Sequence, residues 1–61
     1  METQTEQIKE YIKGQEGLII ELKRMYKITL ELYGYAEALK IKYDIEQANY
    51  KIADLKRRLK E

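Results

Sequence analysis

The chain has 61 residues, with 12 Lys and Arg against 11 Asp and Glu and a formal net charge of +1. It contains no Cys, His or Ser, which excludes disulfides, thiolate metal sites and the commonest catalytic base. The balanced charge gives no bulk attraction to nucleic acid or anionic lipid. A chain this short has a marginal core as a monomer, so we expect self-association to stabilise it.

The composition also constrains location and origin. The first residues are polar and acidic, and the longest apolar run is residues 18–20. Neither resembles a signal peptide or a membrane span, so we expect a soluble cytoplasmic protein. Enrichment in Lys and Glu is typical of thermophile proteins. A narrow residue alphabet would also suit a designed bundle, which stays as an alternative.

A first helix is predicted over residues 5–33, after frayed residues 1–4. Thr3 or Thr5 is expected to cap it, because Thr3 and Glu6 have the spacing of a capping box. Its apolar residues recur at intervals of three and four, as on one face of a helix. This first seam is Ile8, Ile12, Gln15, Ile19, Leu22, Tyr26, Thr29 and Tyr33.

A second apolar column flanks the first seam and widens the apolar face of this helix. It consists of Tyr11, Leu18, Met25 and Leu32. A face this broad suits a helix that contacts more than one neighbour. Gly14 and Gly17 are expected on the opposite side, inside a helix that continues through them because the apolar phase is unbroken.

A second helix is predicted over residues 36–60, and its seam repeats every three and four residues without a miss. This second seam is Ala38, Ile41, Ile45, Ala48, Ile52, Leu55 and Leu59. It is displaced by two residues from a continuation of the first seam, or about 200° around a helix. A tight turn at Gly34, the expected left-handed cap of the first helix, explains the displacement.

Charge favours the same hairpin. Residues 1–21 hold two Lys and five acids (2 − 5 = −3), and residues 51–61 hold five bases and two acids (5 − 2 = +3). Folding back at Gly34 brings these ends together. A single long helix in a coiled coil is the alternative, because Gly alone does not compel a turn.

The predicted fold is therefore all-α, with residues 1–61 forming one antiparallel two-helix hairpin that self-associates into a bundle, a dimer being favoured. The expected oligomer core is Ile8, Ile12, Ile19, Leu22, Tyr26, Ala38, Ile41, Ile45, Ala48, Ile52, Leu55 and Leu59.

Two surfaces could add a function to this assembly. Leu39, Tyr43, Tyr50 and Ala53 share a face opposite the second seam, where Tyr suits a protein partner. The basic residues Lys56, Arg57, Arg58 and Lys60 could contact phosphates.

We expect no catalytic residue, cofactor or metal. The sequence thus predicts a small non-enzymatic interaction, regulatory or scaffolding protein, of viral or plasmid accessory type. A small nucleic-acid-binding or transcription-associated protein that uses the basic end is the alternative. On either interpretation the main partner is a second copy of the chain, and no membrane is involved.

Overall fold

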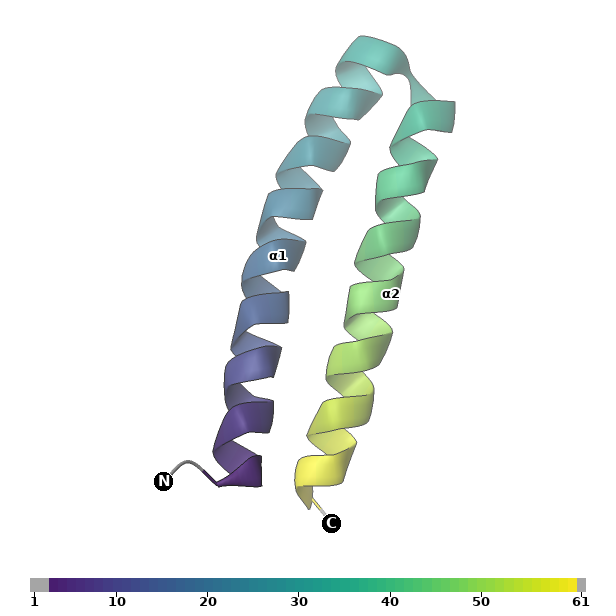
Figure 1. Ribbon diagram of the computed structural model, residues 1–61. Helices are drawn as coiled ribbons and strands as arrows, with labels where there is room; N and C mark the ends of the chain where they lie inside the picture. Colours follow the sequence, from purple (N-terminus) through teal and green to yellow (C-terminus); the bar gives the residue numbers. More distant parts are fainter. Residues whose placement is uncertain (1–2, 61) are drawn as a thin grey trace.

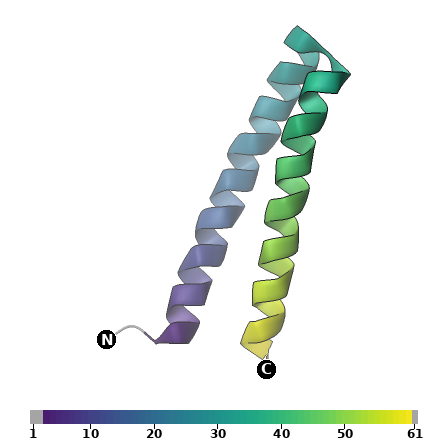
Figure 2. The same cartoon turned by 45° about the vertical axis from the view of Figure 1, so that its right-hand side comes forward.

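A computed structural model describes residues 3–60 as two antiparallel α-helices joined at one residue (Figure 1). Helix α1 spans Gln4–Tyr33 and α2 spans Tyr35–Lys60. The helices lie side by side along their length in both views, so the start of α1 and the end of α2 lie at the same end of the hairpin (Figure 2). The hairpin predicted from the two displaced seams is confirmed, and the single continuous helix is wrong.

Helix α1 begins at a side-chain cap. Thr3 has extended backbone angles, and its Oγ1 accepts a hydrogen bond from the Glu6 amide at 3.2 Å. Its carbonyl accepts from the Gln7 amide at 3.1 Å. Thr3 is therefore the cap, and it satisfies an amide that the first turn would otherwise leave unpaired. Helix α1 then continues through Gly14 and Gly17 without a break.

Gly34 forms the whole turn. Its amide donates to the carbonyls of Thr29 and Leu30, each at 3.2 Å, and so closes α1. Its carbonyl accepts from the Ala38 amide at 3.2 Å and so opens α2. Gly at this boundary replaces the polar N-cap that the sequence before α2 lacks.

The backbone of Gly34 differs from the expected left-handed cap. Its φ of 93° has the expected sign, but its ψ of −179° is extended. The physical reason is that one residue must end α1 and reverse the chain into α2, which leaves no second turn residue to share the change of direction. This region of backbone conformation is essentially restricted to glycine.

The core lies between the helices, where the two seams meet. Ile12, Ile19, Ala48 and Ile52 are buried against one another. Ile8, Ile45, Leu55 and Leu59 pack around them as half-buried side chains. Ala38 is completely buried beside the turn. Burial of an Ile side chain contributes up to about 1.5–3 kcal/mol of hydrophobic stabilisation, so a few residues hold the hairpin together.

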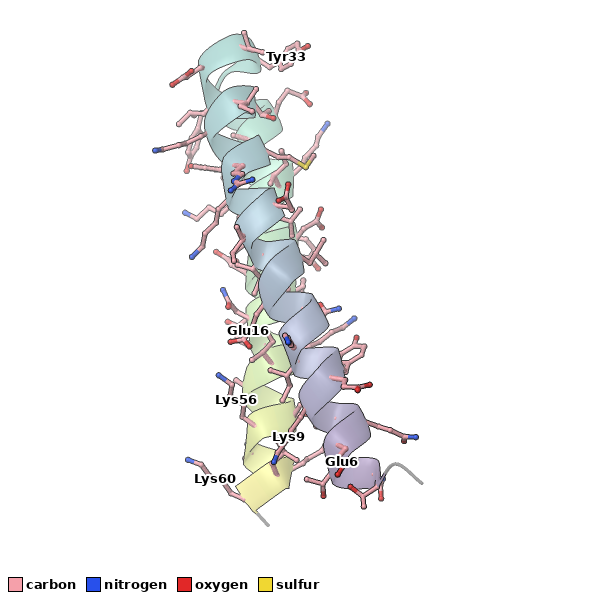
Figure 3. The ribbon with its side chains drawn as sticks, turned by 90° about the vertical axis from the view of Figure 1, so that its left-hand side faces the viewer. Glu6, Lys9, Glu16, Tyr33, Lys56 and Lys60 are labelled. Carbon is pink, nitrogen blue, oxygen red and sulfur yellow. The ribbon has the colours of Figure 1, made fainter. Side chains whose placement is uncertain are left out.

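Tyr33 is the exception to the first seam. It is the last residue of α1 and is 72% exposed, and it projects from the turn end of the hairpin (Figure 3). The reason is geometric: the chain reverses at the next residue, so α2 covers only a small part of this side chain.

Residues 3–60 form fewer ion pairs between the two helices than the opposite net charges of the two ends predict. Among residues 3–60, Glu16 and Lys56 form the one pair that joins α1 to α2, at 3.9 Å along one edge (Figure 3). Asp54 instead pairs within α2, with Arg57 at 3.0 Å and Arg58 at 3.1 Å. The acidic and basic ends do lie together, but Arg57 and Arg58 pair with Asp54 of their own helix and not with the acids of α1.

Candidate functional site

The residues expected to form an oligomer core lie between the two helices of a single chain. Tyr26 and Leu22 on α1, and Ile41 on α2, are half-buried there together with the buried cluster. One chain therefore covers both seams in large part, with Tyr33 as the exception. The role of these residues in an oligomer, and the assembly itself, stay predictions.

The outer face of α2 is the predicted partner surface. Tyr43 is 61% exposed and Tyr50 is 70% exposed, and Leu39 and Ala53 are exposed on the same face. This face lies on the far side of α2 from its buried seam, because the two sets of residues are offset around the helix. The tyrosines are accessible, and their role in binding a partner stays a prediction.

A longer apolar surface runs along α1, beside the core. Ile28, a further exposed residue, falls in line with the column of Tyr11, Leu18, Met25 and Leu32. Gly14 and Glu21 complete the spacing of three and four, so Gly14 lies on this surface and not on the opposite side as expected. We name as the α1 stripe the residues Tyr11, Gly14, Leu18, Glu21, Met25, Ile28 and Leu32.

A charged series follows the same spacing along α2 and lies beside the α1 stripe. Shallow hollows between the helices show this, since one is lined by Tyr11, Lys51 and Asp54. The next is lined by Leu18, Asp44 and Gln47. We name as the α2 charge stripe the residues Glu37, Lys40, Asp44, Gln47, Lys51, Asp54 and Arg58.

The two stripes together form one side of the hairpin, which we name the striped face. Sequence reasoning found four members of the α1 stripe but missed the α2 charge stripe. The spacing of three and four showed that these charges share one face of α2. It did not show which surface of α1 lies beside that face. That information requires the two helices to be placed.

The basic residues at the end of α2 do not form one patch. Lys56, Arg57 and Arg58 follow one another, so each points about 100° away from the next around the helix. Lys56 pairs with Glu16, and both arginines pair with Asp54. Lys60 lies in the last turn. The predicted phosphate contacts are thus spread over several sides of α2, beside carboxylates.

Within residues 3–60, no group of three or more potential metal ligands lies together. Neither α1 nor α2 contains an apolar stretch long enough to cross a bilayer. Comparison of the chain with protein-family models, with curated proteins and with solved structures finds no match.

Proposed function

We propose that this chain is a non-enzymatic interaction or scaffolding module that works as a homo-oligomer. The observation that carries the proposal is how its apolar residues are distributed. The α1 stripe and the outer face of α2 keep large hydrophobic side chains on the surface. Contiguous exposed apolar surface of this kind marks interaction sites in soluble proteins.

The size of the core supports self-association first. The buried hydrophobic residues among residues 3–60 are Ile12, Ile19, Ala38, Ala48 and Ile52. A two-helix unit with so few buried side chains is marginal unless a further contact covers more apolar surface. A second copy is the partner that is present wherever the chain is made.

In this proposal the two exposed apolar faces have different partners. One face binds another copy of the chain in the oligomer, and the other face stays exposed and can bind a different protein. Tyr43 and Tyr50 suit the second role, because Tyr offers apolar area with a polar tip. A scaffolding role needs this separation, since assembly must not consume the binding surface.

The mass in solution tests the proposal. The chain has a mass of 7.4 kDa, so sedimentation equilibrium over a range of concentrations separates monomer from oligomer. We expect a concentration-dependent mass of twice that value or more. A mass of 7.4 kDa at every concentration, with helix content retained, would contradict a homo-oligomeric module.

A further inference from the structure

We infer that the striped face binds a second copy of this chain in antiparallel orientation, with the two Gly34 turns at opposite ends of a four-helix dimer. The inference rests on the proposed homo-oligomer and assigns its interface. A twofold axis perpendicular to the helices would pass Glu21 on α1 and Gln47 on α2. It would lay α1 against α1 of the second copy, and α2 against α2.

The α2 charge stripe carries the inference. Its order is acid, base, acid, Gln, base, acid, base. Reversal about Gln47 inverts every sign, so each charge meets an opposite charge of the second copy. An isologous contact needs this kind of self-complementarity. Three pairs face each other across the interface, and each occurs twice with the two copies exchanged. They are Glu37 with Arg58, Lys40 with Asp54, and Asp44 with Lys51.

The spacing of these pairs is close to regular. Lys40 and Asp54 lie seven residues either side of Gln47. The other two pairs are symmetric about a point half a residue further along α2. One residue rises about 1.5 Å along a helix, so a single axis serves all three pairs within that distance.

The α1 stripe has matching symmetry about Glu21. Gly14 and Ile28 lie seven residues either side of it, and the other two apolar pairs match within one residue. Gly14 has no atom within 4 Å of where a Cβ would stand. It therefore leaves space for the Ile28 side chain of the second copy. The facing pairs are Tyr11 with Leu32, Gly14 with Ile28, and Leu18 with Met25.

The two centres of symmetry lie at the same level of the hairpin. Gln47 lines a hollow together with Leu18 and Leu22 of α1, and Glu21 belongs to that same turn of α1. One axis therefore serves both stripes. The opposite arrangement, with both turns at one end, sets α1 against α2 of the second copy. It would lay the apolar α1 stripe of each copy on the α2 charge stripe of the other and bury charge against apolar surface.

The striped face runs along the hairpin, whose extents are 46 × 19 × 11 Å. It is one of the two broad sides, so it offers a second copy a contact that can extend over the length of both helices, as a standard interface of about 800 Å² per partner requires. Within residues 3–60, Asp44 and Lys51 take part in no ion pair, so both are available. Tyr43 and Tyr50 stay outside the dimer.

The two Glu21 side chains should repel each other in this dimer. Each carboxylate lies next to the axis, where the two copies bring like charges together, although Arg24 pairs with it at 3.3 Å. Removing this charge should therefore strengthen the dimer. We expect Glu21→Leu to lower the dissociation constant by about tenfold.

Charge reversal across the axis tests the α2 contact. Asp44→Lys and Lys51→Asp should each raise the dissociation constant about tenfold, because each affects two symmetry-related pairs. The double variant D44K/K51D should restore dimerisation. Glu46→Lys is the matched control: it makes the same change of charge on the outer face, and both acids follow a Lys by four residues.

A pair of isoleucines tests the α1 contact. Ile28 is 56% exposed and lies on the striped face, whereas Ile20 is 55% exposed and lines a hollow on the other side of α1 with Lys23 and Asn49. Ile28→Lys should abolish dimerisation at concentrations where the unmodified chain is dimeric. Ile20→Lys should not. Circular dichroism checks that every variant keeps its helix content.

The chain has no cysteine, so a single introduced thiol shows whether the same residue of two copies lies next to the twofold axis. Oxidation of Gln47→Cys should link two copies by a disulfide, and Glu46→Cys should link few. These results together support the inference. The inference would be overturned if Ile28→Lys and Asp44→Lys left the oligomer unchanged and Gln47→Cys formed no disulfide. The proposed homo-oligomer would then still stand. A monomer at every concentration would overturn both.

Discussion

The turn offers a sharp test of how the chain reverses, because Gly34 combines a φ of 93° with a ψ of −179°. A Cβ at Gly34 would meet no atom within 4 Å. Replacement of Gly34 by Ala therefore creates no collision and isolates the strain of the backbone. Such a conformation costs a non-glycine residue about 1–3 kcal/mol.

Part of this cost is offset in the unfolded chain. Ala has fewer unfolded conformations than Gly, which favours the folded state by about 0.4–1 kcal/mol. We therefore expect Gly34→Ala to lower the free energy of unfolding by about 1–2 kcal/mol. In a domain of this size each kcal/mol shifts Tm by about 4–8 °C, so Tm should fall by roughly 5–15 °C.

Gly17→Ala is the matched control. Gly17 lies inside α1 with nothing within 4 Å of the position that a methyl group would take, and Ala is favoured over Gly in a helix by about 0.5–1 kcal/mol. The same substitution should therefore raise Tm. Thermal unfolding followed by circular dichroism at one protein concentration measures both, because oligomer stability depends on concentration.

The two results should have opposite signs. If Gly34→Ala raised Tm as Gly17→Ala does, the strained turn would be refuted, since Ala would then be fitting a helix that runs through residue 34. Labels at Lys9 and Lys60, which lie at one end of the hairpin (Figure 3), give a second measurement. A straight helix would separate them by about 75 Å.

Three further predictions concern the two helices. Thr3→Ala should lower the free energy of unfolding by about 1 kcal/mol through loss of the helix cap, measured by urea unfolding, whereas Thr3→Ser should keep most of it. Ile52→Ala should cost about 2–4 kcal/mol because this side chain is buried. The exposed Ile20→Ala should change stability by less than about 0.5 kcal/mol, and equal losses would contradict the described core. Removing the exposed pair between Glu16 and Lys56 by Glu16→Gln should cost less than about 1 kcal/mol, a difference that about 1 M salt should erase.

The sequence was sufficient to predict the hairpin because its two seams are nearly complete. Each places apolar residues at helical spacing, and the displacement between them requires the chain to change direction near Gly34. The structure has the helices within one residue of their predicted bounds. The cap at Thr3 follows from the same local chemistry, since it depends on residues three positions apart.

The conformation of Gly34 was beyond sequence reasoning. A positive φ follows from glycine at a helix end, but ψ depends on where α2 must start, and that is a property of the two packed helices. The striped face was missed for a similar reason. Gly14 and Glu21 interrupt the apolar pattern of α1, and the charges of α2 gain meaning only when the hairpin sets them beside it.

The one-residue turn also has a consequence for the folding pathway. Because Gly34 alone separates the helices, contacts between them are nested in sequence, with the shortest loops at the turn and the longest at residues 8 and 59. Loop-closure entropy therefore rises gradually from one contact to the next. Folding should start beside Ala38 and zip toward the chain ends on the fast time scale of proteins with local contacts. Amide exchange should run in the reverse order, fastest at the open end and slowest in the buried turns of the core.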